Sequence, residues 1–236
     1  MGAPPSEYFY AFPFPHRPAF GSGPGLSFSL SFMMKIGLFG GTFDPVHNGH
    51  LIVARDAVEA LGLDALHFIP NHISPHKLDL GRTSAGLRVE MLRRAIEGEP
   101  CFHLYEGELE REGVSFSIDT VLDFRRTFPG DELFYLIGED NLPDLHTWQR
   151  IGELLELSTF VVQTRDRRSR SGIPLTPDAP QLTPAQKARL RFLPQRQIDI
   201  SATEIRKRVA KRQSIRYFVP ESVHDIITRH HLYTAS

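Results

Sequence analysis

Residues 37–50 read GLFGGTFDPVHNGH, and this stretch passes from an apolar run, through two glycines and an Asp-Pro turn, into the start of a helix. The apolar run is typical of a buried strand. A helical period continues over residues 49–63, and the side chains expected to face inward are Leu51, Ala54, Val58 and Leu61. A strand followed directly by an amphipathic helix is the first half of a βαβ unit, which favours a parallel sheet.

The same alternation of apolar runs and amphipathic segments continues to the end of the chain. The expected strands are residues 35–40, 65–70, 101–109, 131–138, 158–164 and 188–194. The expected helices are residues 49–63, 84–98, 117–130, 141–157 (with a break near Trp148), 201–212 and 220–231. This order predicts an α/β fold with a doubly wound, Rossmann-like parallel sheet flanked by helices, and a C-terminal helical segment.

Local signals predict where several helices begin and end. Ser117 is an expected N-cap, because its hydroxyl can accept a hydrogen bond from an orphan amide. Pro220 is expected at the first position of the last helix, and Gly98 is an expected stop. In the helix over residues 84–98, the expected inward-facing side chains are Leu87, Met91, Leu92 and Ala95.

Composition narrows the class of protein. The 236 residues carry 27 Lys and Arg against 28 Asp and Glu, so the overall charge suggests neither nucleic acid nor a membrane surface as partner. The single cysteine, Cys101, leaves no internal disulfide and fits a reducing compartment. No apolar stretch reaches the roughly 18 residues of a membrane helix, and no secretory signal is evident. We therefore expect a cytoplasmic protein.

The first 32 residues differ from the rest of the chain. They are rich in Pro, Gly, Ser and Phe and contain only Glu7 and Arg17 as charged side chains. We expect this part to be a disordered or non-native extension, followed by one domain over residues 33–236. A second Pro-rich and basic stretch, residues 165–184, is expected to be a mobile surface loop, with a lid over an anionic substrate as the alternative.

The turn after the first strand has the composition of a phosphate site. Gly40 and Gly41 let the backbone approach a ligand closely, and the helix that follows begins with unpaired amides. His47 and His50 lie three residues apart, on one face of the first helical turn. Two alternatives stay open: a purely structural histidine pair, and a zinc site completed by His72 or His76 that would support metal-assisted hydrolysis.

A second motif, ISATEIRKR, follows the last expected strand at residues 200–208. Ser201 is its expected N-cap, and Glu204 would complete a capping box. Thr203 and Arg206 stand three residues apart on one helical face. An arginine beside hydroxyls at a helix N-terminus suits a polyphosphate, because a guanidinium pairs bidentately with phosphate oxygens. The alternative is an ordinary capped basic helix.

Taken together, these motifs resemble the HxGH nucleotidyltransferases, and within them the bacterial nicotinate-nucleotide adenylyltransferases. The resemblance rests on GGTFDPVHNGH and ISATEIR, with further matches at SPHK, RVEML, SFSIDT, LIGEDNL and Trp148, and it covers residues 34–236. It implies transfer of the adenylyl group of ATP to nicotinate mononucleotide, giving deamido-NAD and pyrophosphate in NAD biosynthesis. It also implies Mg²⁺ bound mainly by the ATP phosphates, with no protein metal site.

The resemblance further implies a role for each matching residue. His47 and His50 would contact the phosphates around the transferred α-phosphorus, and Ser201, Thr203 and Arg206 would hold the β- and γ-phosphates. His47, His50 and Arg206 are thus the candidate catalytic residues. The other implied ATP contacts are Gly40, Gly41, Thr42, Phe43, Gly138 and Asp140, the last two at the ribose. Nicotinate mononucleotide would contact Lys77, Thr120 and Trp148.

Three of these residues also have a plainer interpretation. Asp140 could cap a helix, Trp148 could belong to the core, and Lys77 could be a solvated loop charge. Three positions depart from the family's pattern, which affects loop geometry more than chemistry: Ala202 replaces a second Ser, Arg212 replaces a Gly, and Arg165 alone represents an Arg-Pro-Gly turn.

Several other functions remain open at this point. Sister transferases act on nicotinamide mononucleotide, phosphopantetheine or a phospho-alcohol. A zinc hydrolase and a nucleotide-binding regulatory module represent different classes. The sequence leaves the oligomeric state open.

Overall fold

The computed structural model describes residues 33–71, 83–111, 115–165, 181–196 and 198–234. Six strands form one sheet in the order β3-β2-β1-β4-β5-β6, and every neighbouring pair is parallel. Their bounds are β1 Lys35–Gly41, β2 Ala65–Pro70, β3 Phe102–Leu104, β4 Glu132–Gly138, β5 Thr159–Arg165 and β6 Leu190–Gln195. This is the doubly wound strand order, so the predicted fold class is confirmed.

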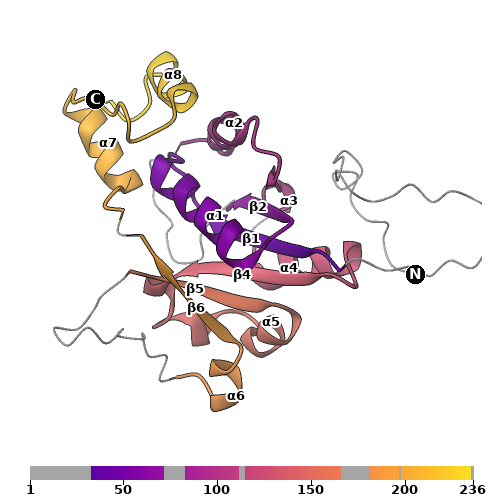
Figure 1. Ribbon diagram of the computed structural model, residues 1–236. Coiled ribbons are helices and arrows are strands. Elements are labelled where there is room, and N and C mark those ends of the chain that lie inside the picture. The colour runs from indigo at the N-terminus through magenta and orange to yellow at the C-terminus, as the bar shows by residue number, and fades with distance from the viewer. Residues whose placement is uncertain (1–32, 72–82, 112–114, 166–180, 197, 235–236) are drawn as a thin grey trace, which may run out of the picture.

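Helices cover both faces of the sheet, as Figure 1 shows. The longer ones are α1 Asn48–Leu61, α2 Ala85–Ile96, α4 Ser117–Thr127, α5 Ile151–Leu157, α7 Ala202–Ala210 and α8 Glu221–Arg229. Short helical turns lie at α3 Gly107–Glu110, η2 Glu139–Asn141, η3 Leu145–Thr147 and α6 Pro184–Lys187. Helices α1, α2 and α8 lie on one side of the sheet, and α5 and α6 lie on the other. The predicted break near Trp148 is confirmed, because η3 ends at Thr147 and α5 begins at Ile151. The predicted helix before the break is wrong, because only the 3-10 turns η2 and η3 form there.

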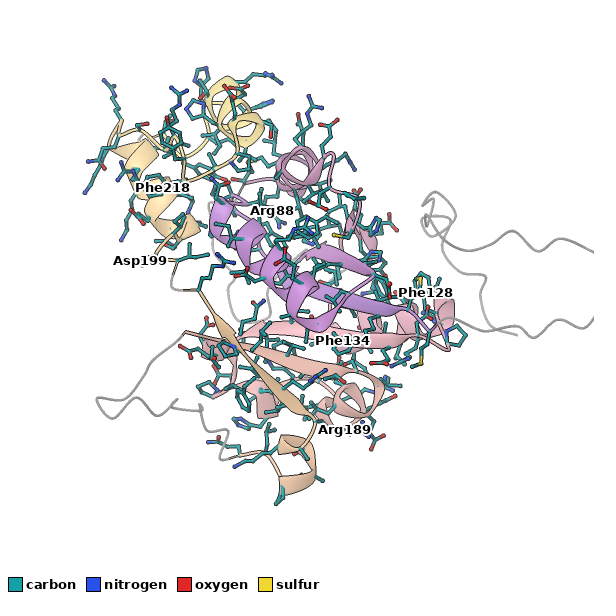
Figure 2. The ribbon with its side chains drawn as sticks, in the orientation of Figure 1. Arg88, Phe128, Phe134, Arg189, Asp199 and Phe218 are labelled. Carbon is teal, nitrogen blue, oxygen red and sulfur yellow. The ribbon has the colours of Figure 1, made fainter. Side chains whose placement is uncertain are left out.

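Each face of the sheet has its own apolar core. Successive residues of a strand point to opposite faces, so Phe134 and Leu136 of β4 join the core under α1 and α2. Leu133, Tyr135 and Ile137 of the same strand join the core under α4 and α5. Figure 2 shows the side chains that fill both layers. Within the described ranges, every helix is too short or too polar to span a bilayer.

The third strand is shorter than predicted. Only Phe102–Leu104 pairs with β2, and the rest of the expected strand turns into α3. A Cβ on Gly107 would lie 2.4 Å from the hydroxyl oxygen of Tyr105, so the tyrosine ring occupies the space that the glycine leaves. A glycine with no side chain to pack also weakens a strand. The chain therefore leaves the sheet soon after Leu104.

Several predicted helix details are wrong, and packing explains them. The N-cap of α4 is Phe116, because the Ser117 hydroxyl accepts a hydrogen bond of 2.9 Å from Tyr135 instead. Pro220 is the N-cap of α8 and not its first residue. Arg212 adopts a φ of 55°, the left-handed conformation that a glycine would favour at this helix end.

The inward faces of α1 and α2 are each rotated slightly from the prediction. In α1, Ala54 and Val58 are buried as expected, but Val53 and Ala57 replace Leu51 and Leu61. In α2, Met91 and Leu92 are buried as expected. Leu87 and Ala95 are only partly buried, and the buried positions beside them are taken by Arg88, Val89 and Ile96.

The predicted C-terminal helical segment packs against the first core. Ile205 of α7 and Val223, Ile226 and Ile227 of α8 are buried in it. The Ser222 hydroxyl also donates a hydrogen bond of 3.2 Å to the carbonyl oxygen of Arg94 in α2. This packing brings the end of the chain to the first βα turn.

Candidate active site

The strand order reverses between β1 and β4, which lie side by side at the centre of the sheet. In open parallel sheets, ligands bind at the carboxyl ends of the strands beside such a reversal. Gly41 ends β1 there and Gly138 ends β4, and α1 begins at Asn48 just beyond. The glycines and histidines of the first motif therefore lie at the position where this fold binds ligands.

His47 and His50 form a reciprocal cap at the start of α1. The amide of His50 donates to Nδ1 of His47 at 3.3 Å, and the amide of His47 donates to Nδ1 of His50 at 3.2 Å. The two rings stack with their centroids 3.7 Å apart. Because both Nδ1 atoms accept hydrogen bonds, a neutral ring carries its proton on Nε2. Each histidine is thus a structural cap that retains one hydrogen-bond donor.

Burial also determines the charge of this pair. Burial lowers the pKa of His47 to about 4. Burial, with a smaller contribution from His47, lowers the pKa of His50 well below its ordinary value. Both rings are therefore neutral at physiological pH, and they offer N–H donors and no positive charge.

Phe43 supports the histidine pair from beneath. Its ring is 2% exposed and meets the ring of His50 edge-on at a centroid distance of 5.1 Å. A Cβ on Gly41 would lie 2.8 Å from the Phe43 ring. The absence of a side chain at Gly41 therefore makes room for this ring, which the sequence interpretation did not anticipate, and Phe43 can offer a ligand only its backbone.

The second motif lies against the first. Nη1 of Arg206 donates to the carbonyl oxygen of Asp44 at 2.6 Å, and Nη2 donates to the Thr203 hydroxyl at 3.2 Å. Asp44 and Arg206 are 162 positions apart in the chain. The start of α1 is held from the same side, because the amide and the side chain of Asn48 donate to the carbonyl oxygens of Phe218 and Tyr217 at 2.9 and 2.7 Å.

Ser201 caps α7 as predicted, with its hydroxyl accepting from the amide of Glu204 at 3.1 Å. The predicted return bond of a capping box is wrong. Among the described contacts, the Glu204 carboxylate lies 4.0 Å from Nη1 of Arg208, along the helix. Ser201 and Thr203 are exposed, whereas Arg206 is partly buried.

Sequence reasoning missed Arg88, which is 3% exposed. Its Nη1 donates to the carbonyl oxygen of Thr42 at 2.7 Å, and its Nη2 donates to that of Asn71 at 2.9 Å. The arginine thereby ties the end of β1 to the end of β2. The motif RVEML contains it, but a helical arginine is usually exposed, so the pattern gave no sign of its burial.

The implied ribose contacts lie at the end of β4. Asp140 is exposed within η2, and its Oδ1 occupies the space next to Gly138, where a Cβ would lie 2.4 Å away. Gly138 itself is at the N-cap position of η2, so the alternative interpretation of Asp140 as a helix cap is wrong.

Trp148 packs at the edge of the second core. It is partly buried and meets the rings of Tyr135 and Phe160 edge-on, each at a centroid distance of 6.0 Å. The hydroxyl of Tyr135 lies 3.1 Å from where a Cβ on Gly40 would be. Tyr135 therefore links the tryptophan to the glycine pair.

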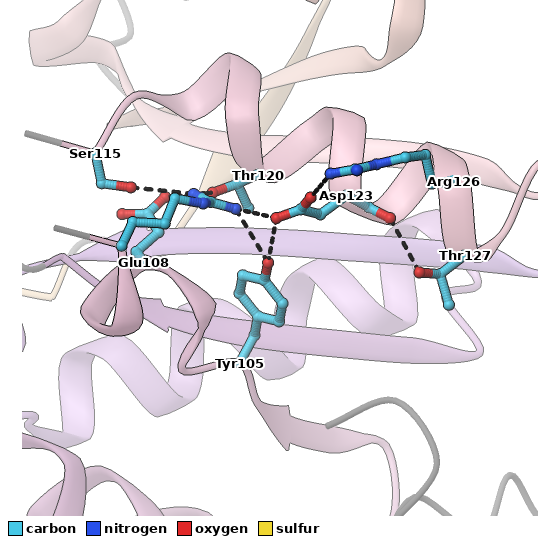
Figure 3. Close-up of polar contacts among 8 residues, drawn as sticks. Tyr105, Glu108, Ser115, Thr120, Asp123, Arg126 and Thr127 are labelled. Carbon is cyan, nitrogen blue, oxygen red and sulfur yellow. Dashed lines mark hydrogen bonds and ion pairs between the residues drawn. The ribbon is translucent and has the colours of Figure 1, made fainter. Parts of the chain in front are cut away.

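Thr120 belongs to a buried polar network, shown in Figure 3. Its side chain is fully buried, and its hydroxyl donates to Oε1 of Glu108 at 2.7 Å and accepts from Nη1 of Arg111 at 3.0 Å. Arg111 also bonds to Ser115 at 3.1 Å and pairs with Asp123. The single proton of the Thr120 hydroxyl is therefore already donated, which the sequence interpretation did not foresee.

Three candidate site residues, Lys77, His72 and His76, lie outside the described residues. So do the expected extension over residues 1–32 and most of the expected loop over residues 165–184. Across the described ranges, no three His, Cys, Asp or Glu side chains are grouped as a metal site.

Comparison with known proteins agrees with this geometry. The model of the cytidylyltransferase-like family matches residues 38–208. The nicotinate-nucleotide adenylyltransferase of Bacillus subtilis is 38% identical over 201 residues, which are 85% of this chain and 99% of that protein. A Bacillus pumilus protein named "Probable nicotinate-nucleotide adenylyltransferase" is 41% identical over the same shares of the two chains.

Solved structures show the same fold. The nicotinic acid mononucleotide adenylyltransferase of Plasmodium falciparum, complexed with NaAD, superposes with a TM-score of 0.65 at 17% identity, over 85% of this chain and 97% of that one. Its complex with APC gives a TM-score of 0.63 over the same shares. From the identity and coverage of its curated relatives, the chain belongs to the nicotinate-nucleotide adenylyltransferases, a family of nucleotidyltransferases with a cytidylyltransferase-like domain.

Proposed function

We propose that this enzyme transfers the adenylyl group of ATP to nicotinate mononucleotide, giving deamido-NAD and pyrophosphate in cytoplasmic NAD biosynthesis. The observation that carries the proposal is the hydrogen bond of 2.6 Å from Arg206 to the carbonyl oxygen of Asp44. This bond joins the second motif to the turn that leads into the histidine pair, which supports a single phosphate site built from both motifs. Relatives named for this activity support the choice of substrates.

In this reaction a phosphate oxygen of nicotinate mononucleotide attacks the α-phosphorus of ATP. The bond from the α-phosphorus to the bridging oxygen of the β-phosphate breaks, and its electron pair leaves with pyrophosphate. The attacking phosphate is already anionic at neutral pH, so no general base is needed. The protein mainly aligns the reacting groups and stabilises the charge on the phosphoryl oxygens.

His47 and His50 suit that task as neutral donors. Their Nδ1 atoms are occupied by backbone amides, so the Nε2 protons are the ones that can bind phosphate oxygens around the α-phosphorus. An anion at Nε2 would raise the pKa of both rings and strengthen these hydrogen bonds.

Arg206, Thr203 and Ser201 would hold the β- and γ-phosphates of the leaving group. The guanidinium of Arg206, in α7, can pair with two phosphate oxygens, and the exposed hydroxyls of Ser201 and Thr203 can donate to others. Mg²⁺ would enter as a complex with ATP and neutralise part of the phosphate charge. The donors described at this site fit that arrangement, because they are N–H and O–H groups suited to bind phosphate oxygens.

The remaining candidate residues would contact the phosphates, the ribose and the nicotinate ring. The backbone of residues 40–43 would line the phosphates, with Gly138 and Asp140 at the ribose. The nicotinate ring would stack on Trp148, while Thr120 and Lys77 complete its site. The Thr120 hydroxyl already donates its hydrogen bond to Glu108. A direct hydrogen bond from Thr120 to the nicotinate carboxylate therefore requires the bond to Glu108 to break.

Pyrophosphate release from ATP tests the proposal, with nicotinate mononucleotide and nicotinamide mononucleotide compared as acceptors. We expect a higher kcat/KM for the acid. A preference for the amide or for phosphopantetheine would instead assign the chain to a sister transferase activity.

Two outcomes would point to another class of function. Activity that strong chelators abolish, and that excess Mg²⁺ does not restore, would identify a zinc hydrolase. ATP binding without pyrophosphate release from any acceptor would identify a regulatory module.

A further inference from the structure

The end of the chain folds back onto the first βα turn. Helix α8 ends at Arg229, and His231 and Tyr233 then adopt φ values of 50° and 63°. The left-handed conformation is costly for residues other than glycine, so the surrounding structure must stabilise it. The amide of Leu232 bonds to the carbonyl oxygen of Ile227 at 3.0 Å, and both Leu232 and Tyr233 pack against the first core.

This turn brings Tyr233 to Asp44. The tyrosine hydroxyl donates to Oδ1 of Asp44 at 2.6 Å, across 189 positions of the chain. Asp44 is 5% exposed, so its carboxylate depends on protein partners for stabilisation. Burial, followed by the bond to Asp44, raises the pKa of the Tyr233 phenol, which therefore stays protonated and able to donate.

Asp44 is shared by two side chains from the C-terminal segment. Its backbone carbonyl oxygen accepts from Arg206, and its carboxylate accepts from Tyr233. If the phenol were lost, the buried carboxylate would need another donor, and the nearby Arg206 guanidinium is a strong one. An arginine drawn to that carboxylate would be less available to a ligand.

We propose that Tyr233 is a positioning residue for ATP, acting through Asp44 to keep Arg206 directed at the β- and γ-phosphates. The inference rests on the proposed function of Arg206. The Tyr233 hydroxyl supplies the hydrogen bond that the buried Asp44 carboxylate needs, so the Arg206 guanidinium stays bonded to the Asp44 carbonyl oxygen. When ATP binds, the guanidinium can exchange that neutral acceptor for an anionic phosphate oxygen.

The test compares Tyr233→Phe with Tyr217→Phe. Both substitutions remove one phenolic oxygen, but the Tyr217 side chain is 80% exposed and contributes only its backbone oxygen to the site. Binding of Mg²⁺-ATP is measured by calorimetry without an acceptor, and KM is then measured for both substrates. We expect Tyr233→Phe to weaken ATP binding about tenfold, with the KM for nicotinate mononucleotide changed by less than about twofold and Tyr217→Phe like the wild type.

A double-mutant cycle with Asp44→Asn tests the route of the effect. An amide at position 44 carries no charge that competes for Arg206, so Tyr233→Phe should weaken ATP binding by less than about twofold in that background. If Tyr233→Phe does not fold, ATP binding by the Asp44→Asn single variant tests the proposal instead. This variant should bind ATP as tightly as the wild type or more tightly.

Unchanged ATP binding in Tyr233→Phe, even with a lowered Tm, would overturn the proposal. So would an equal loss in the Asp44→Asn background, an equal rise in both KM values, or weak ATP binding by Asp44→Asn alone. Failure of the wild type to release pyrophosphate with nicotinate mononucleotide would instead refute the proposed function, and the calorimetric comparison would still report on Tyr233.

Discussion

The amide of His50 donates to Nδ1 of His47, and the amide of His47 donates to Nδ1 of His50, at 3.3 and 3.2 Å. This exchange makes the pair a helix cap. It also fixes the ring proton of each neutral histidine on Nε2, the atom that remains for a ligand. The structural and the functional interpretations of the two histidines are therefore compatible, because they use different nitrogen atoms.

Substitution of His47 should separate these two roles. Asparagine is a good N-cap but lacks the Nε2 donor. We expect His47→Asn to retain about 1 kcal/mol more unfolding free energy than His47→Ala in urea titrations. Both variants should lose about 100-fold or more in kcat/KM. An active His47→Asn enzyme would show that the Nε2 proton is not needed.

The lowered pKa of His47 should make stability depend on pH. The unfolded chain binds a proton at this residue near its ordinary pKa of 6.5, whereas the folded protein binds it only near pH 4. The contribution of His47 to the unfolding free energy is therefore fully present above pH 6.5. As the pH falls toward 4, the unfolding free energy should decrease by about 3 kcal/mol.

Urea titrations between about pH 7 and pH 4 check this dependence, with His47→Asn as the control. Histidines away from this pair contribute equally to both proteins, so they cancel in the comparison. His50 does not cancel fully, because His47 contributes to the lowering of its pKa, and this difference has the same sign as the effect of His47. Wild type and His47→Asn should converge in unfolding free energy as the pH falls, or cross. Parallel curves would mean that the pKa of His47 is the same in the folded and the unfolded protein.

Two glycine substitutions should have opposite effects. A Cβ at Gly41 would lie 2.8 Å from the buried Phe43 ring, whereas a Cβ at Gly86, in α2, meets nothing within 4 Å. We expect Gly41→Ala to lower the unfolding free energy by about 1–3 kcal/mol through overpacking. Gly86→Ala should raise it by about 0.5–1 kcal/mol, because alanine is the better helix former. A Gly41→Ala protein as stable as the wild type would contradict this packing.

The buried network around Thr120 should contribute to stability. Thr120→Val removes the donor to Glu108 and the acceptor for Arg111, so the unfolding free energy should fall by about 1–3 kcal/mol, while Thr120→Ser should stay close to the wild type. The ratio of kcat/KM for the acid over the amide then tests the proposed nicotinate contact. If this ratio is the same in Thr120→Val as in the wild type, Thr120 stabilises the buried network and does not contact the nicotinate ring.

Local patterns predicted the alternating strands and helices of a parallel sheet, and they identified the two motifs that meet at Asp44 and Arg206. Each expected strand overlaps an observed one, because the apolar runs and the helical periods are local signals. The errors arise where a distant partner decides. Ser117 bonds to Tyr135 instead of capping its helix, and Tyr105 fills the space beside Gly107 where the third strand was expected to continue.

The places of the buried Arg88 and the partly buried Tyr233 were beyond sequence reasoning for the same reason. Arg88 is held by carbonyl oxygens at the ends of two strands, and Tyr233 is held by a carboxylate 189 positions away. Neither arginine in a helix nor tyrosine near a terminus indicates burial. Their places follow from the assembled sheet and not from neighbouring residues.

In the proposed function, the two motifs form one phosphate site for adenylyl transfer to nicotinate mononucleotide. Steady-state pyrophosphate release from ATP and nicotinate mononucleotide, measured for the wild type and for His50→Ala, tests it most directly. We predict turnover by the wild type and a loss of about 100-fold or more in kcat/KM for the folded variant. Turnover that survives His50→Ala would contradict the account.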